Sequence, residues 1–318
     1  MLRMLKLYTV IPCFNEEAVI QETSARLVQK YGHLIADARI SADSKIVFVD
    51  DGSRDATWKI VENLHAGNTM LSGIKLSRNQ GHQNALLAGL MAVRQEADVV
   101  ISMDSDLQDD IDAMDEFLKQ HELGCDIVYG VRKERKSDSF FKRFTAEFFY
   151  KLLRFMGAEV IFNHADYRLM SKRALESLSE FEEVNLFLRG IIPMLGYKTG
   201  TVLYVRHERF AGETKYPFKR MLDLALQSIT SLSVKPIRVV SFLGMSISLV
   251  SLLFLIYIIT GYFLGWTVAG WASLGVSIWF LGGLQLLAIG VIGEYVAKTY
   301  LETKHRPRYI IEKTLFQT

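Results

Sequence analysis

The hydrophobic residues of this chain follow two different patterns along its length. In the first half, short apolar runs alternate with segments whose apolar residues recur at helical spacing. The runs predict strands at 7–12, 45–49, 70–76, 98–103 and 126–131, and the segments between them predict helices at 16–31, 55–64, 84–95 and 111–122. Strands that alternate with helices are typical of a parallel, doubly wound α/β sheet. We therefore expect such a sheet in the first half of the chain.

Near the C-terminus the hydrophobic positions become continuous. Residues 239–293 include no charged side chain. Because about 20 residues cross the hydrocarbon core of a membrane as a helix, this run is long enough for two spans, predicted at about 238–262 and 271–295. A buried helical hairpin of a soluble protein is the alternative, and an uncharged run of this length argues against it.

The charges around the two predicted spans indicate their orientation. Lysine and arginine residues precede and follow the pair, whereas the intervening turn at 261–270 carries neither. By the positive-inside rule, both flanks are expected in the cytoplasm and the turn outside. The segment 139–156 combines a broad aromatic face with a mostly cationic stripe, which favours a helix in the membrane interface. A core helix of the soluble domain is the alternative for that segment.

Composition agrees with a chain that is partly in water and partly in a membrane. Half of the 318 residues are hydrophobic, which is high for a soluble enzyme and low for a polytopic transporter. The net charge of +2 gives no general attraction to nucleic acid. Cys13 and Cys125 each lie next to a predicted strand, as expected of buried thiols in a reducing compartment. The first eight residues lack the features of a signal peptide, so the N-terminal part is expected in the cytoplasm.

The candidate chemistry lies directly after the central predicted strand. Asp104 and Asp106 follow its last apolar residue, and Gln108 comes two positions later. In open α/β sheets, ligands bind at the carboxyl ends of the strands, and carboxylate oxygens suit Mg²⁺ or Mn²⁺. A solvated turn that begins a helix, with Asp109 or Asp110 as its N-cap, is the alternative. The chain has neither a Gly-x-Gly-x-x-Gly motif after the first strand nor a Walker A sequence.

An acidic loop on a membrane-anchored domain suggests a specific division of labour. The loop would hold a cation that neutralises a polar diphosphate donor, and the anchor would bring the domain to an acceptor held in lipid. Sugar nucleotides are donors of this kind, because their diphosphate leaves with negative charge that a divalent cation can stabilise. An oxocarbenium-like transition state would be expected at the sugar.

Several motifs occur in a fixed order along the chain. They are Val-Ile-Pro-Cys-Phe-Asn-Glu at 10–16, Val-Asp-Asp-Gly-Ser at 49–53, Leu-Ser-Arg-Asn at 76–79, Met-Asp-Ser-Asp-Leu-Gln-Asp at 103–109, Asp-Tyr-Arg-Leu-Met at 166–170 and Arg-Phe-Ala-Gly-Glu-Thr-Lys-Tyr at 209–216. Together with the two C-terminal spans, this series resembles the family-2 glycosyltransferases of GT-A fold. Within them it resembles the polyprenyl-phosphate glycosyltransferases, which include bactoprenol glucosyltransferases and dolichol-phosphate mannose synthases.

The resemblance implies a domain plan. Residues 1–217 would form a cytoplasmic catalytic domain with the GT-A fold, a Rossmann-like, doubly wound mixed sheet. Residues 218–236 would form a juxtamembrane amphipathic helix, 237–297 a hairpin of two transmembrane helices, and 298–318 a cytoplasmic tail. The protein would then be an integral protein of the cell (inner) membrane.

The resemblance also implies roles for particular residues. The nucleobase and ribose would be framed by Pro12, Phe14, Glu16 and Asp51. The metal, Mg²⁺ or Mn²⁺, would be held by Asp104, Asp106 and Gln108, and Asp104 would also contact the nucleotide. Phosphate groups of the acceptor or donor would be contacted by Arg132, Arg135, Arg209 and Lys215.

Asp166, Asp106 and Arg209 would serve catalysis. Asp166 stands where the family has a carboxylate near the acceptor, as a base or as a group that orients Arg168 or the sugar. Surface salt bridges are the alternative for Arg132 and Arg135, and capping or pairing is the alternative for Asp166.

Two positions depart from the family pattern. Phe14 stands where a tyrosine is common, so a hydroxyl contact is lost while stacking is retained. Asp110-Ile111-Asp112 replaces prolines that often follow the metal motif, which leaves the loop less stiff and more acidic.

The sequence therefore predicts inverting transfer of one sugar from a nucleotide-diphosphate sugar to undecaprenyl or another polyprenyl phosphate, for cell-envelope glycan modification. UDP-glucose is the favoured donor, with UDP-N-acetylglucosamine or GDP-mannose as alternatives. A processive polysaccharide synthase and a non-catalytic nucleotide-sugar-binding partner are more remote alternatives. Expected partners are the donor, the lipid acceptor and the membrane, and candidate protein partners are a second copy of the chain, a flippase and a downstream glycosyltransferase.

Overall fold

The computed structural model describes residues 4–133, 164–184, 186–205, 235–264 and 270–316. The chain divides into two compact units. Of the described residues, those up to 133, 164–205 and 306–316 belong to the first unit, and 235–305 belong to the second.

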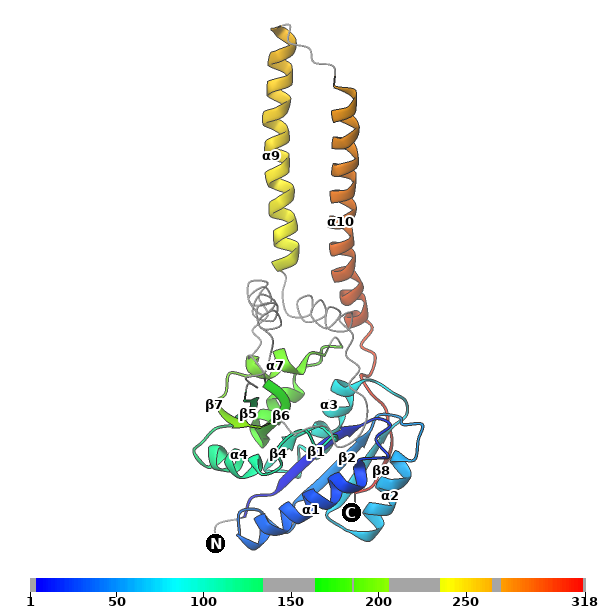
Figure 1. Cartoon of the computed structure of the whole chain (residues 1–318), viewed down its shortest axis with the longest axis vertical. Coiled ribbons are helices and arrows are strands. Elements are labelled where there is room, and N and C mark those ends of the chain that lie inside the picture. The colour runs from blue at the N-terminus through cyan, green and yellow to red at the C-terminus, as the bar shows by residue number, and fades with distance from the viewer. Residues whose placement is uncertain (1–3, 134–163, 185, 206–234, 265–269, 317–318) are drawn as a thin grey trace. The chain divides into compact units, whose positions relative to one another are not determined.

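The first unit is built on one mixed sheet of eight strands (Figure 1). They are β1 (Leu7–Cys13), β2 (Lys45–Asp50), β3 (Leu71–Leu76), β4 (Val99–Ser102), β5 (Ile127–Arg132), β6 (His164–Ser171), β7 (Thr199–Tyr204) and β8 (Ile311–Thr314), in the spatial order β7-β5-β6-β4-β1-β2-β3-β8. β6 and β8 run antiparallel to their neighbours, and the other pairs are parallel. The predicted doubly wound α/β sheet is confirmed.

Helices cover both faces of this sheet, so the unit has three layers. α1 (Ile20–Ala36), α2 (Thr57–Gly67) and α4 (Ala113–Glu122) pack on one face, while α3 (His82–Val93), α6 (Lys172–Ser179) and α7 (Leu188–Met194) pack on the other. Successive strand residues point to opposite faces. In β1, Leu7 and Ile11 belong to the hydrophobic core on the side of α1, α2 and α4. Tyr8 and Val10 belong to the core on the side of α3, α6 and α7. Because both faces are buried, the central strands are mostly apolar on both sides rather than alternating between apolar and polar residues.

The five strands predicted from the first half of the sequence all form, but β6, β7 and β8 were missed. β6 lies between β4 and β5, so these two strands run in the same direction without pairing. Its sequence places the buried charged residues Asp166 and Arg168 inside the strand. Those charges interrupt the apolar run from which a strand would be predicted.

The described C-terminal residues return to the sheet. β8 pairs antiparallel with β3, and the Leu315 amide donates to the Gly73 carbonyl at 2.7 Å. The Ser77 amide donates to the Ile310 carbonyl at 3.0 Å, just beyond the end of β3. The segment assigned to a tail therefore contributes a strand at the edge of the sheet.

The described part of the second unit consists of α9 (Lys235–Phe263) and α10 (Trp271–Thr303). These helices cover the predicted spans, and α10 continues eight residues beyond position 295. In the described residues, Phe280–Thr303 is long and apolar enough to cross a membrane. The helix predicted at 139–156 and residues 218–234 of the predicted juxtamembrane helix lie outside the described residues.

Candidate functional site

The candidate site lies where the direction of strand succession reverses. β2 and β3 follow β1 on one side, whereas β4 pairs with its other side. Loops that leave such a switch point diverge and create a crevice at the carboxyl ends of the strands. The loop after β4 carries Asp104 and Asp106, so the predicted metal motif occupies the position where this class of sheet binds ligands.

The loop after β4 has a defined, partly strained geometry. The Gln108 amide donates to Asp106 Oδ1 at 3.2 Å, and the Thr23 hydroxyl of α1 donates to the Ser105 carbonyl at 2.8 Å. Leu107 between them has φ of 57°, a left-handed conformation that is uncommon for a branched side chain. Such strain persists only where surrounding contacts hold it, and it is concentrated at functional sites.

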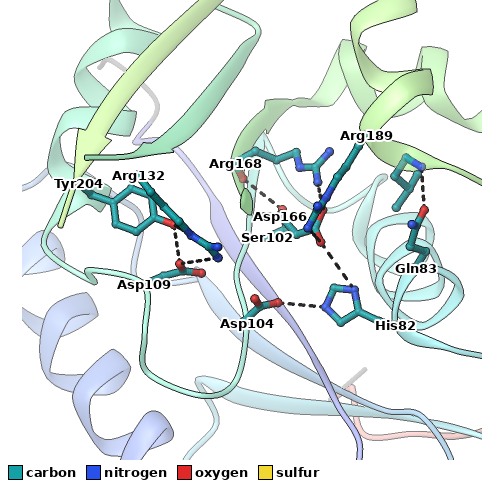
Figure 2. A network of polar contacts seen from close by, with 11 residues as sticks. His82, Gln83, Ser102, Asp104, Asp109, Arg132, Asp166, Arg168, Arg189 and Tyr204 are labelled. Atoms are coloured by element: carbon teal, nitrogen blue, oxygen red, sulfur yellow. Dashed lines mark hydrogen bonds and ion pairs between the residues drawn. The ribbon is translucent and has the colours of Figure 1, made fainter. Parts of the chain in front are cut away.

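His82, at the start of α3, joins two carboxylates of this region (Figure 2). Its Nε2 lies 3.0 Å from Asp104 Oδ1, and its Nδ1 lies 3.9 Å from Asp166 Oδ2. Desolvation lowers the pKa of His82, but the hydrogen bond and charge of Asp104 outweigh it and raise the pKa above the ordinary value. The same contact holds the pKa of Asp104 below its ordinary value, although desolvation opposes it. Each of the two groups therefore favours the charged form of the other.

Asp166 is held between two guanidinium groups (Figure 2). β6 brings it beside β4, where the Ser102 hydroxyl donates to the Asp166 carbonyl at 2.6 Å. Arg168 Nη2 donates to Asp166 Oδ1, and Arg189 Nη2 of α7 donates to Oδ2 at 2.9 Å. Burial raises the pKa of Asp166, but the charges of Arg168 and Arg189 outweigh it and hold the pKa well below its usual range.

Asp109, on the same loop, joins a second polar cluster. The Tyr204 hydroxyl donates to Asp109 Oδ1 at 2.6 Å, and Arg132 Nε donates to the Tyr204 hydroxyl at 3.3 Å. Arg132 Nη2 lies 3.9 Å from Asp109 Oδ1. Burial and the charge of Asp104 raise the pKa of Asp109 to about 6, and the Tyr204 bond and Arg132 oppose the shift. Arg132 is thus fixed at the side of the acidic loop.

Asp51 braces the loop that precedes His82. Its carboxylate accepts the Gln80 amide at 2.7 Å and the Gly81 amide at 2.9 Å, and the residue is buried. A Cβ at Gly52 would lie 2.6 Å from the carbonyl carbon of Arg78, so only glycine fits there. The predicted nucleotide-framing residue therefore also fixes the backbone of the β3–α3 loop.

The other predicted nucleotide residues lie at the end of β1. Pro12 is buried within the strand, and Phe14 beyond it is 41% exposed. The Glu16 amide donates to Thr57 Oγ1 at 2.9 Å, which ties this loop to the start of α2. The loop after β1 is thereby held against the loop after β2, with an aromatic ring left open to solvent.

The described residues fit a cation that takes part of its coordination from a substrate. Within the described part of the chain, no three side chains of histidine, cysteine, aspartate or glutamate are grouped closely enough to hold a metal. Asp104 and Asp106 supply carboxylate oxygens at the switch point, and Mg²⁺ usually takes one or two carboxylates together with substrate phosphates and water. The donor set therefore fits a hard divalent cation bound with a diphosphate.

The structure brings most of the predicted site residues to one edge of the sheet. These are Pro12, Phe14, Glu16, Asp51, Asp104, Asp106, Gln108, Arg132 and Asp166, all at or beyond strand ends or beside β4. Arg135, Arg209 and Lys215 lie outside the described residues.

Sequence reasoning missed three residues of these clusters: His82, Arg189 and Tyr204. The Asn-Gln-Gly segment before α3 was a usable signal for His82, because a glycine turn after a parallel strand places the next residue at the same edge. The other two belong to elements that were not predicted.

Comparison with known proteins identifies the family. Residues 8–179 match the protein family described as "Glycosyl transferase family 2". A Bacillus subtilis (strain 168) protein named as the uncharacterized glycosyltransferase YkoT is 53% identical over 307 residues, which cover 96% of this chain and 91% of that protein. The prophage bactoprenol glucosyl transferase homolog of Escherichia coli (strain K12) is 39% identical and covers 97% of this chain and 99% of its own.

A solved structure also resembles the chain. Mannosyl-3-phosphoglycerate synthase from Rubrobacter xylanophilus aligns with a TM-score of 0.47 and 14% identity, over 70% of this chain and 71% of that chain.

The family match over residues 8–179 spans β1 through α6 and includes the switch point with Asp104 and Asp106. The chain therefore belongs to glycosyl transferase family 2.

Proposed function

We propose that this glycosyltransferase transfers one sugar from a nucleotide-diphosphate sugar to a polyprenyl phosphate, with inversion at the anomeric carbon. The observation that carries the proposal is the position of Asp104 and Asp106 at the switch point, with Arg132 beside the same loop. Relatives that share nearly the whole chain are named bactoprenol glucosyl transferases. UDP-glucose is accordingly the first donor to test, followed by UDP-N-acetylglucosamine and GDP-mannose.

The acidic loop would bind the donor diphosphate. Asp104 and Asp106, with Gln108, would hold Mg²⁺ or Mn²⁺, which stabilises the negative charge of a departing diphosphate. Phe14 is exposed at the end of β1 and would stack on the nucleobase, with Pro12 and Glu16 at the same loop. Asp51 would shape this pocket through its bonds to the 80–81 backbone.

The acceptor phosphate would supply the nucleophile. One of its oxygens attacks the anomeric carbon from the face opposite the nucleoside diphosphate, and the bond from that carbon to the diphosphate breaks with its electron pair leaving on the diphosphate. A phosphate monoester has a second pKa of about 6 and is largely ionised at neutral pH, so the attack needs no base. Arg132, and from the sequence Arg135, Arg209 and Lys215, would neutralise the two phosphate groups as they approach.

Asp166 would position arginine side chains rather than remove a proton. Two guanidinium groups neutralise it and keep its pKa low, which makes it a poor base. Its bonds to Arg168 and Arg189 instead fix the side of the site opposite Arg132.

The membrane location follows from the acceptor. A polyprenyl phosphate holds its headgroup at the membrane surface, and α9 with α10 would anchor the catalytic unit there as a two-helix hairpin. The flanking lysines and arginines favour catalysis on the cytoplasmic face. A flippase and a glycosyltransferase that uses the lipid-linked sugar would be the natural partners of such a product. A second copy of the chain would pair through the spans, and a dimeric purified protein would support that pairing.

The test is a donor panel with the purified full chain in detergent. Undecaprenyl phosphate is incubated with each radiolabelled nucleotide sugar, with Mn²⁺, with Mg²⁺ or with EDTA, and the lipid product is separated. We expect a single lipid-linked sugar, dependence on metal, and no transfer by the Asp106→Asn variant, which should still insert into membranes. Formation of long glycan chains would favour a processive synthase, and donor binding without transfer would favour a non-catalytic partner.

A further inference from the structure

Several carboxylates lie close together at the acidic loop. Asp104 and Asp106 each repel Asp109, and Asp166 repels Asp104. Asp166 is neutralised by arginines, and Asp109 is bonded to Tyr204. The side-chain partner of Asp104 is His82, which donates from Nε2 at 3.0 Å.

We propose that His82 is a positioning residue for the metal site, holding one oxygen of Asp104 so that the other faces the cation. This inference rests on the proposed metal-dependent function. His82 itself would not coordinate the metal, because its Nε2 is occupied by Asp104 and its Nδ1 faces Asp166.

The backbone of His82 is unusually well fixed for this role. The preceding residue, Gly81, has φ of 87° and donates its amide to the buried carboxylate of Asp51. The following residue, Gln83, accepts the Leu188 amide of α7 at 2.9 Å. The first turn of α3 is thus held from the β2 side and from α7, and the imidazole can direct Asp104 without being displaced by it.

A hydrogen-bond partner that fixes a ligand matters more at this site than at a metal site whose ligands all come from the protein. Within the described residues only a partial set of carboxylate ligands is available, so the orientation of each carboxylate carries a large share of the affinity. Partners that orient metal ligands typically contribute 10–100-fold to metal affinity or activity.

The experiment measures Mn²⁺ binding to the full chain in detergent by electron paramagnetic resonance, with and without UDP. We expect His82→Ala to weaken Mn²⁺ binding by about 10–100-fold and His82→Gln to recover part of the loss, since an amide can also donate to Asp104. In the transfer assay, His82→Ala should raise the Mn²⁺ concentration needed for half-maximal rate, and saturating Mn²⁺ should restore most of kcat. His33→Ala, at an exposed position of α1, is the matched control and should bind Mn²⁺ as the native chain does.

The outcomes separate this inference from the proposed function. Native Mn²⁺ affinity in a folded His82→Ala variant overturns the inference and leaves the proposed function intact. Unchanged Mn²⁺ affinity with a raised KM for the donor instead assigns His82 to the donor itself and also overturns it. A native chain that binds no Mn²⁺ in an Asp106-dependent manner defeats the proposed metal site and the inference with it. If the alanine variant fails to fold, His82→Leu, which fills more of the same space and cannot donate to Asp104, takes its place, and native Mn²⁺ affinity in that variant overturns the inference.

Discussion

The Tyr204 hydroxyl donates to Asp109 Oδ1 at 2.6 Å, and this bond ties the end of β7 to the acidic loop after β4. β7 lies at one edge of the sheet and β4 lies three strands away, so the contact crosses β5 and β6 at their ends. Arg132 of β5 donates to the same hydroxyl. The Tyr204 hydroxyl therefore contacts both the acidic loop and Arg132, the side chain that we expect to bind phosphate.

Removing that hydroxyl tests the dependence. Tyr204→Phe keeps the ring, whose edge-to-face contact with Tyr167 has centroids 5.4 Å apart, but leaves the buried Asp109 carboxylate without its donor. We expect the free energy of unfolding to fall by about 1–3 kcal/mol and kcat/KM for the lipid acceptor to fall about tenfold, equivalent to ~1.4 kcal/mol. Chemical unfolding and initial rates of the full chain in detergent measure both.

Tyr197→Phe is the matched control for this variant. It removes a hydroxyl that lies 2.7 Å from the Ser177 hydroxyl of α6, away from the acidic loop. A loss of stability without loss of acceptor efficiency is expected there. Equal losses of acceptor efficiency in the two variants would show that Tyr204 acts only through general stability.

How far the sequence predicts the fold depends on how charge is distributed in each strand. Most residues of β1 to β5 are apolar, because the sheet is buried on both faces. β6 contains a buried ion pair, and the exposed residues of β7 and β8 give no apolar run, so local pattern did not reveal them. The pairing of β8 with β3 joins residues more than 230 positions apart, which no local periodicity encodes.

The site was predictable where its residues end a recognisable strand. Asp51, Asp104 and Arg132 follow or close the strands β2, β4 and β5, and parallel strands bring their carboxyl ends to one edge. His82 and Arg189 lie in the first turns of α3 and α7, which pack on the same face of the sheet. These residues reach Asp104 and Asp166 only through tertiary packing. The pairing of Asp166 with two arginines likewise requires the antiparallel placement of β6, which the sequence did not indicate.

Asp166→Asn tests whether this carboxylate positions arginines or accepts a proton. Arg168 is 1% exposed, and its side chain is bonded to Asp166 through Nη2. Loss of the negative charge leaves a buried guanidinium uncompensated, and we expect the free energy of unfolding to fall by about 3–5 kcal/mol together with loss of transfer. Added formate should not restore the rate. Asp112→Asn, at a carboxylate that is 85% exposed, is the control and should behave as the native chain does. Recovery of transfer with formate in Asp166→Asn would instead assign Asp166 as the base.

Gly52→Ala tests the brace between the loops after β2 and β3. Gly52 has φ of 67°, and a Cβ there would lie 2.6 Å from Asn79 N, where backbone atoms cannot yield. We expect destabilisation by about 2 kcal/mol or more and a raised KM for the donor, because the 78–81 backbone must move away from Asp51. Gly67→Ala, in α2 with nothing within 4 Å of the added Cβ, should be neutral or stabilising by up to ~1 kcal/mol. Calorimetry and donor titration compare the two, and a native KM in Gly52→Ala would remove the proposed link between this turn and donor binding.

The C-terminal strand offers a test of whether residues beyond α10 support the catalytic sheet. Deleting residues 309–318 removes the pairing of β8 with β3, the packing of Leu315 on one core and the packing of Tyr309 and Phe316 on the other. We expect a loss of at least about 2 kcal/mol in the free energy of unfolding, as for loss of a packed leucine, and aggregation through the exposed edge of β3. Transfer should also fall, because the Ser77 amide loses the Ile310 carbonyl just before the loop that leads to His82.

Lys313→Ala, which removes only a solvent-exposed ion pair with Glu62, should cost less than about 1 kcal/mol and leave transfer unchanged. Light scattering, chemical unfolding and the transfer assay on the full-length and shortened chains compare these outcomes, and native stability of the shortened chain would mean that β8 adds nothing to the sheet that it pairs with.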